Sequence, residues 1–411
     1  MKRPEARLFL IAIIISLAIT TCHGQKIQVL LTGQIHESVN SLQMWFMSEP
    51  LVDFLSVPAR DEPRGILGGD EAMRRMIRIY FPRTYEDVRR YDFILLNSPV
   101  IYLFTDRQIR WMYDGIRQGS GGINTASVMS HLEIEHSAWT GCILQMAFPN
   151  DAPGVVASQW GPGSPLKGFH IVVNRDFPEP VLTPFVPLGI ESFYGYGSRY
   201  VKAREGASTL CWQVGNFPEE GVPYMIAWDY EKGRTLTMAD GFGFVFWGAN
   251  RQIQNSNPYG LDILMNVIFF STGREVQTDV LLLHHMRTSF MSFRERMSLL
   301  VSLMDFVERC GANPRRLDVL LAGLEQQFNL AGEKYVVQDF EGCQDTMNSG
   351  WKALSNAESE AMKLKANALA WIYVVEWSIT SSALTFSGFL LWTLMVKRKL
   401  YKSAGLTKGL G

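Results

Sequence analysis

The sequence is poor in the residues from which most catalytic and metal centres are built. Among its 411 residues are only 5 cysteines and 7 histidines, and their spacing matches no zinc-binding pattern. Acidic and basic residues nearly balance, giving a formal net charge of −1. The chain therefore lacks the basic surplus typical of nucleic-acid-binding proteins, and we expect neither a nucleic acid partner nor a cofactor.

A phosphate-binding glycine loop is absent as well. The one glycine-rich run, residues 119–122, reads Gly-Ser-Gly-Gly and lacks the Gly-Lys-Ser or Gly-Lys-Thr that cradles nucleotide phosphates. Such a run is typical of a helix end followed by a tight turn.

The N-terminus has the layout of a secretory signal. Three basic residues among the first seven precede an apolar run over residues 8–19, and small residues follow up to Gly24. This order of basic, apolar and small residues predicts a cleaved signal peptide over residues 1–24. An uncleaved N-terminal anchor is the alternative.

The C-terminal region contains a long apolar segment, and a basic run follows it. Residues 371–396 are apolar apart from Glu376 and several hydroxyl side chains, which is enough to cross about 30 Å of hydrocarbon as a helix. Aromatic residues lie near both ends, and basic residues begin at Lys397. By the positive-inside rule we predict one transmembrane helix over residues 371–396 and a basic cytoplasmic tail over residues 397–411.

The first two thirds of the chain alternate between strand and helix patterns. Apolar runs at 26–32 and 91–97 predict buried strands. Thr105, with Gln108 three residues later, predicts a capped helix that ends near Gly119. Strand, helix, glycine turn and strand in this order predict an α/β domain with a mostly parallel sheet over residues 25–275.

A helical region follows this domain. Helical periodicity predicts helices over 291–310, 314–330 and 333–370, and we interpret residues 276–370 as a membrane-proximal stalk. Four cysteines remain after the signal, and an even number permits disulfides in an extracytoplasmic chain. Cys310 and Cys343 both fall in the stalk and are the favoured pair, ahead of Cys142 and Cys211.

Three segments carry a resemblance to a known family. They are the strand and turn at 91–96 and 119–122, the Tyr-Glu-Lys-Gly-Arg-Thr-Leu hairpin at 230–236, and the helix at 266–270. In these segments the chain resembles the class I glutamine amidotransferase-like superfamily, especially its non-canonical, trehalose-utilisation-like and membrane-associated branches. The resemblance implies a flavodoxin-like arrangement. The C-terminal anchor resembles those of archaeal surface proteins.

Active members of this superfamily use a cysteine on a sharp strand-to-helix turn, with a histidine and a glutamate downstream. The corresponding stretch here, residues 123–128, contains no cysteine, and residues 224–250 contain no histidine. Ser127 or Thr125 could replace the thiol, with His131 or His136 as the base. Asn124 and Thr125 precede Ser127 and are the candidate ligand-binding residues.

The densest polar cluster lies directly after this stretch. His131, Glu133, Glu135 and His136 alternate so that several would share one face of a strand or helix. His131, Glu133 and His136 form a candidate divalent-metal site with a position left open for water. A solvated loop is the alternative interpretation.

These observations predict a single-pass protein at the cell membrane with its N-terminal domain extracytoplasmic. We expect a catalytically silent, amidotransferase-like domain that contacts the lipid bilayer through its anchor and binds an envelope protein or a carbohydrate. The alternative is an extracytoplasmic hydrolase or amidase that uses Ser127 or a metal near His131 and His136.

Overall fold

The computed structural model describes residues 25–35, 41–61, 68–125, 138–150, 168–196, 200–215, 221–242, 246–247, 257–310, 313 and 315–407. The chain forms two compact units. The first comprises Met1–Met291 and Gly332–Cys343, and the second comprises Ser292–Ala331 and Gln344–Gly411. The signal peptide expected over residues 1–24 lies outside the described residues.

The first unit is built on one nine-stranded sheet with the order β2-β1-β3-β4-β9-β8-β7-β5-β6. Four neighbouring pairs, from β2 to β9, are parallel, and the other four, from β9 to β6, are antiparallel. The strands are β1 (Ile27–Gly33), β2 (Val52–Pro58), β3 (Phe93–Asn97), β4 (Gly121–Thr125), β5 (Gly168–Val173), β6 (Gly195–Tyr196), β7 (Ser208–Val214), β8 (Val222–Tyr230) and β9 (Gly233–Met238).

The prediction of an α/β domain is confirmed, but the prediction of a mostly parallel sheet is wrong because the sheet is mixed. The physical reason lies in the connections. Only two residues, Glu231 and Lys232, separate β8 from β9, and a link that short can join only antiparallel strands. The hairpin therefore reverses the strand direction between β9, which is parallel to β4, and β8, and the parallel half ends at β9.

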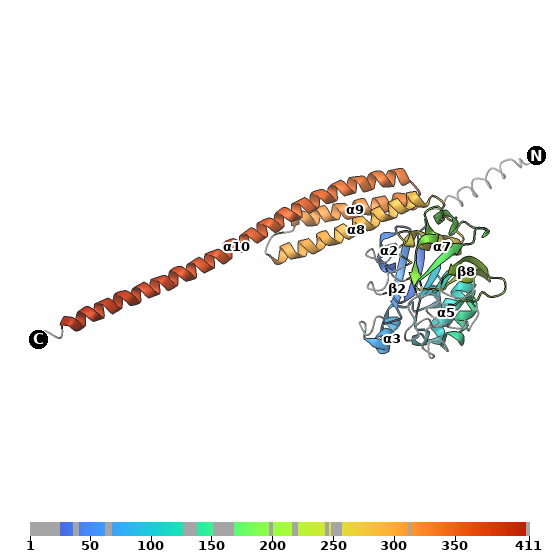
Figure 1. The fold of residues 1–411 in the computed structure, drawn as a ribbon, viewed down its shortest axis with the longest axis horizontal. Helices are drawn as coiled ribbons and strands as arrows, with labels where there is room; N and C mark the ends of the chain where they lie inside the picture. Colours follow the sequence, from blue (N-terminus) through green and yellow to red (C-terminus); the bar gives the residue numbers. More distant parts are fainter. Residues whose placement is uncertain are drawn as a thin grey trace, which may run out of the picture. The chain divides into compact units, whose positions relative to one another are not determined.

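Each face of the sheet is covered by its own hydrophobic core. Alternation along β1 sends Val29 and Leu31 into one core and Leu30 into the other. Apolar residues of α2 (Leu42–Ser48) and α7 (Gly260–Ser271) join the first core, and those of α3 (Gly69–Tyr80) and α5 (Asp106–Arg117) join the second. Figure 1 shows these two helix pairs among the strands of the first unit.

Local signals in the sequence set the ends of these helices. Thr105 and Gln108 form the expected reciprocal capping box at the start of α5. The short helix α4 (Tyr85–Val88) begins at Thr84, whose side chain accepts a hydrogen bond from the backbone of Asp87. Both caps satisfy backbone N–H groups that the first helical turn leaves without partners.

The second unit contains the helices expected for the stalk. They belong to α8 (Val280–Arg309), α9 (Arg315–Val336) and α10 (Phe340–Thr407). Phe293 lies between α9 and α10, with its ring centroid 5.8 Å from that of Phe328 and 5.2 Å from that of Trp351. The helix expected over residues 333–370 is divided near Gln338, whose φ of 64° interrupts the helical backbone.

The C-terminal part of α10 is long and apolar enough to cross a membrane. This helix runs from Phe340 to Tyr401, and no residue of its most apolar stretch is buried against the rest of the chain. Figure 1 draws it as one continuous helix that ends near the C-terminus. The predicted candidate span is thus present.

The favoured disulfide between Cys310 and Cys343 is not formed. Both cysteines, together with Cys142 and Cys211, are free thiols. Cys310 directly follows α8, Cys343 lies in the first turn of α10, and the 22 residues of α9 intervene. A helix of that length spans about 33 Å, whereas the Cα atoms of a disulfide lie within about 7 Å.

Candidate functional site

The parallel half of the sheet has a topological switch point between β1 and β3. β2 lies on one side of β1 and β3 lies on the other, with β4 beyond β3. The chain therefore continues from β1 to β2 in one direction across the sheet and from β3 to β4 in the opposite direction. In open α/β sheets, ligands bind outside the carboxyl ends of the strands at such a point. The carboxyl ends of β1, β3 and β4 are therefore the first candidate site.

Hydrogen bonds tie the ends of β1 and β3 together at this point. The backbone N–H of Gln34 donates to the carbonyl oxygen of Asn97 at 2.7 Å, and the amide nitrogen of Asn97 donates to the carbonyl oxygen of Gln34 at 2.7 Å. Gly33 has a φ of 115°, and any side chain there would collide with the backbone of Asn97. Only glycine permits this close approach.

Ser98 and Thr125 connect the ends of β3 and β4. The backbone N–H of Ser98 donates to Oγ1 of Thr125 at 3.0 Å, and the two hydroxyl oxygens lie 3.1 Å apart. Ser98 has a φ of 54°, a left-handed conformation that is uncommon for a residue other than glycine. Thr125, a predicted ligand-binding residue, is thus buried and bonded to Ser98 rather than facing open solvent.

Three side chains at these strand ends carry polar atoms that have no hydrogen-bond partner among the described residues. They are Oγ1 of Thr32, Oδ1 of Asn97 and Oδ1 of Asn124, and all three residues are buried. Asn124 is the other predicted ligand-binding residue, and in β4 it lies beside Thr237 of β9. An unpaired buried acceptor costs about 1–3 kcal/mol, so these atoms are available to a hydroxyl or N–H donor that reaches them.

The remaining predicted site residues lie outside the described part of the chain. These are Ser127, His131, Glu133 and His136, in the segment 126–137 that follows β4. Within the residues that are described, no three histidine, cysteine, aspartate or glutamate side chains are grouped as metal ligands. The metal hypothesis accordingly stays a prediction for residues 131–136.

The thiols nearest to the sheet are poorly suited to nucleophilic attack. Cys211 is fully buried in β7, and burial raises the pKa of its thiol. Cys142 is partly buried, and burial likewise raises its pKa, against the opposing effect of hydrogen bonds from the backbone of Leu144 and Gln145. Since the thiolate is the reactive form, neither cysteine has the lowered pKa of a catalytic thiol.

A second polar cluster, which the sequence did not predict, lies where α8 begins. Nε of Arg287 donates to Oε2 of Glu49 at 2.6 Å, and its Nη1 donates to Oδ1 of Asp262 at 2.8 Å. The three side chains are at most 3% exposed. We call Glu49, Asp262 and Arg287 the buried ionic triad; they come from the segment before β2, from α7 and from α8.

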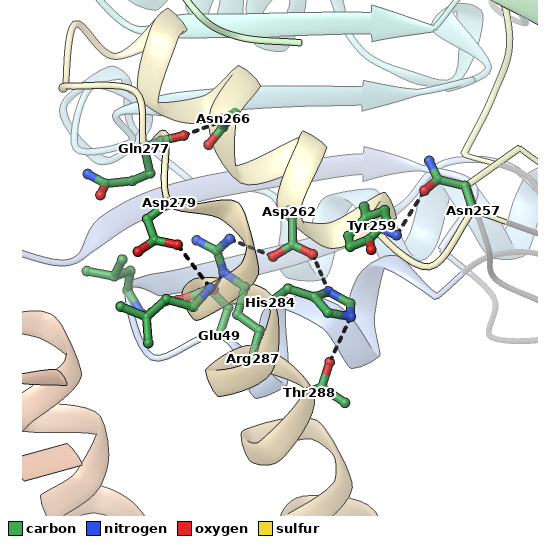
Figure 2. Close-up of polar contacts among 12 residues, drawn as sticks. Glu49, Asn257, Tyr259, Asp262, Asn266, Gln277, Asp279, His284, Arg287 and Thr288 are labelled. Carbon is green, nitrogen blue, oxygen red and sulfur yellow. Dashed lines mark hydrogen bonds and ion pairs between the residues drawn. The ribbon is translucent and has the colours of Figure 1, made fainter. Parts of the chain in front are cut away.

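His284 extends the triad towards solvent. Its Nδ1 lies 2.7 Å from Oδ2 of Asp262, and its Nε2 lies 3.5 Å from Oγ1 of Thr288. Figure 2 shows the Asp262 carboxylate bridging the imidazole of His284 and the guanidinium of Arg287. Asp262 therefore orients two side chains, which are one turn apart on α8.

The charges of the triad do not balance, because two carboxylates share one guanidinium. Burial raises the pKa of Glu49, and the opposing effect of Arg287 is the smaller one. Burial by itself would lower the pKa of Arg287, but Glu49 and Asp262 raise it above its ordinary value. Arg287 is thus charged at all physiological pH values, and Glu49 is the member that most readily takes up a proton.

One sequence signal could have revealed the triad. Val280, Leu283 and Phe290 are buried at helical spacing along α8, and Arg287 falls on the same face. An arginine at an apolar position of a helix must find buried carboxylates, but the sequence gives no indication of which ones.

Comparisons with known proteins do not assign the chain to a family. No family model matches it, and no curated protein matches it. Among solved structures, it is similar to the cytoplasmic protein STM3548 from Salmonella typhimurium, with 14% identity and a TM-score of 0.40 over 59% of this chain and 98% of that one.

Two further solved structures are similar to a lower degree. The cytoplasmic protein STM1381 from Salmonella typhimurium LT2 has 14% identity and a TM-score of 0.36 over 59% of this chain and 96% of that one. The mmIFT52 N-terminal domain has 12% identity and a TM-score of 0.32 over 58% of this chain and 95% of that one. Scores in this range carry no argument about function.

We expect Arg287→Met to lower the free energy of unfolding of the first unit by about 3–5 kcal/mol, because it removes the ionic partner of buried Glu49 and leaves buried Asp262 with His284 alone. Urea unfolding of the purified chain measures this change. The matched control is Arg175→Met, which removes the more exposed ion pair with Glu191 and should cost below about 1 kcal/mol. Equal effects of the two substitutions would contradict the assignment.

The raised pKa of Glu49 predicts a pH dependence of stability. In the unfolded chain this carboxyl titrates near its ordinary value of 4.5, so the folded state holds the proton to higher pH than the unfolded state does. The resulting stabilisation is complete below pH 4.5 and is lost as pH rises through the folded pKa.

The difference between the wild type and Glu49→Gln isolates this contribution. We expect the free energy of unfolding of the wild type to fall with rising pH, relative to that of Glu49→Gln, above pH 4.5. Urea unfolding across a pH series checks it. A difference that stays constant, or that grows in favour of the wild type, would show that the pKa of Glu49 is not raised.

Proposed function

We propose that this chain is a membrane-anchored, amidotransferase-like α/β domain that is catalytically silent and binds a ligand or partner in the cell envelope. The ligand site in this proposal is the carboxyl ends of β1, β3 and β4, with Asn124 and Thr125 among its residues. The flavodoxin-like arrangement that the sequence resemblance implies for this domain is part of the same proposal.

One observation carries the binding function. The acceptor atoms of Thr32, Asn97 and Asn124 are buried at these strand ends, and within the part of the chain that the structure describes they have no hydrogen-bond partner. Buried acceptors are complemented by donors such as hydroxyl groups, which favours a carbohydrate over an anionic ligand. The high pKa values of Cys142 and Cys211 support a site that does not hydrolyse amides through a thioester.

The anchor is the second part of the proposal. In water, the exposed apolar side chains of α10, including Trp377, Leu384 and Phe389, would be unfavourable. In a bilayer they would face hydrocarbon, while Trp371 and Trp392 would lie near the two interfaces. Lys397, Arg398 and Lys399 follow the span and support a cytoplasmic C-terminus.

We expect the full chain to remain in the membrane fraction after carbonate extraction, and a variant that ends at residue 370 to be recovered in the soluble fraction. Protease added to intact cells should digest the domain of the full chain but not the tail after Lys397. A protected domain with an accessible tail would reverse the orientation, and a full chain that extracts as a soluble protein would refute the anchor.

The purified full chain should release no ammonia from glutamine above background, because residues 123–128 contain no cysteine and residues 224–250 contain no histidine to act as a base. Ammonia release is measured for the wild type, Ser127→Ala and Cys142→Ala. Turnover that disappears in Ser127→Ala would establish the alternative, an extracytoplasmic hydrolase or amidase. Turnover that is lost on adding a chelator would establish a metal enzyme near His131 and His136.

A further inference from the structure

Within the second unit, α8 carries a row of apolar side chains that α9 and α10 leave uncovered. Leu299, Leu303 and Phe306 are spaced four and three residues apart, so they lie on one side of the helix. Leu299 is 69% exposed and Phe306 is 40% exposed. The row adjoins α10, because Arg296, one turn before Leu299, forms an ion pair with Glu358 of that helix.

A matching row lies on the neighbouring side of α10. It repeats the same spacing and consists of Glu358, Met362, Lys365 and Leu369. Nζ of Lys365 lies 5.7 Å from the ring centroid of Phe306, so the two rows run side by side and in the same direction. Met362 is 55% exposed. We call the apolar members of both rows the α8–α10 patch: Leu299, Leu303, Phe306, Met362 and Leu369.

The row on α10 continues into the candidate membrane span. Glu376, Thr380, Ala383 and Ser387 each follow one member of that row by 18 residues, which is five turns of a helix. Glu376 is the one charged residue between residues 371 and 396. The hydroxyl of Thr380 donates to a backbone carbonyl of its own helix, whereas the carboxylate of Glu376 has no partner among the described residues.

The two parts of this row suit neither water nor lipid. Apolar side chains that gather on a surface in water mark a protein contact. Charged residues in a transmembrane helix almost always face another helix or a water-filled cavity, and small residues such as Ala383 and Ser387 let helices approach closely. A partner that covers both parts must carry its own membrane span and a water-exposed helical segment directly above it.

The area of the patch indicates what else the contact needs. The exposed fractions of Leu299, Phe306 and Met362 correspond to about 300 Å² of surface per copy. A stable interface buries about 800 Å² per partner, so the patch supplies less than half and the span must supply much of the rest. A second copy in the same bilayer presents both parts at the same height, and a two-fold axis matches each part with itself.

We propose that the chain forms a parallel homodimer through the α8–α10 patch and the side of the span that carries Glu376. The two-fold axis runs along the membrane normal. The patches of the two copies pack against each other above the bilayer, and each Glu376 faces the partner's span instead of hydrocarbon. This inference rests on the membrane anchor in the proposed function, but on neither the ligand site nor the amidotransferase resemblance.

The oligomeric state of the full chain tests the proposal. Light scattering of the chain in a mild detergent should give the mass of a dimer. Leu299→Glu places a charge in the apolar contact and should raise the Kd of the dimer at least about tenfold. The matched control is Val319→Glu, since Val319 is 73% exposed on α9 and lies outside the patch; it should leave the Kd unchanged. A monomeric wild type, or equal effects of the two substitutions, would overturn the proposal.

A cross-link at Cys310 tests the same contact in the membrane. Cys310 continues the row on α8, four residues after Phe306, and is partly exposed. A short bismaleimide added to isolated membranes should give a covalent dimer of the wild type and of Cys142→Ser, but not of Cys310→Ser. If carbonate leaves the chain in the membrane and no dimer depends on Cys310, the dimer is refuted and the anchor stands. If carbonate extracts the chain, the anchor is refuted together with this interface.

Discussion

The buried ionic triad is the interaction on which the arrangement of the first unit depends. Arg287 of α8 forms ion pairs with Glu49, 238 residues earlier, and with Asp262 of α7. Charged hydrogen bonds in a low-dielectric interior are directional and are costly to leave unpaired, so the first turns of α8 have one position in which all three groups are satisfied. Apolar contacts alone would permit small rotations of the helix. The triad therefore contributes specificity of packing more than net stability.

The triad also fixes the guanidinium that Tyr335 contacts. Because Nε and Nη1 of Arg287 are held by carboxylates, the third nitrogen of the guanidinium has a fixed direction. Tyr335 packs beside it at the end of α9, and burial raises the pKa of its hydroxyl, so the group remains a neutral donor. The ring of Phe290 lies 5.5 Å from that of Tyr335 and limits its movement. Arg287 and Tyr335 therefore hold the end of α9 against the first turns of α8.

Local sequence patterns predicted the elements of the fold but not the way in which they pair. The capping box at Thr105, the buried strand ending at Asn97 and the hairpin around Gly233 are local, and each agrees with the structure. The mixed sheet was missed because the β8–β9 hairpin joins the edge of the parallel half through the non-local pair β4–β9, so that the antiparallel strands extend the same sheet. Asn124 and Thr125 were placed correctly at the end of a strand, whereas Arg287 was missed because its partners are remote in sequence.

The two edges of the parallel half of the sheet differ in hydrogen-bonding character. At the carboxyl edge, the unpaired atoms of Asn97 and Asn124 are carbonyl oxygens, which can only accept. At the amino edge, the guanidinium of Arg287 is instead held by Glu49 and Asp262 and lies against the hydroxyl of Tyr335. Each unpaired buried group costs about 1–3 kcal/mol, a large share of the 5–15 kcal/mol by which a domain is stable. The unpaired acceptors therefore favour the carboxyl edge as the ligand site, with hydroxyl donors as their complement.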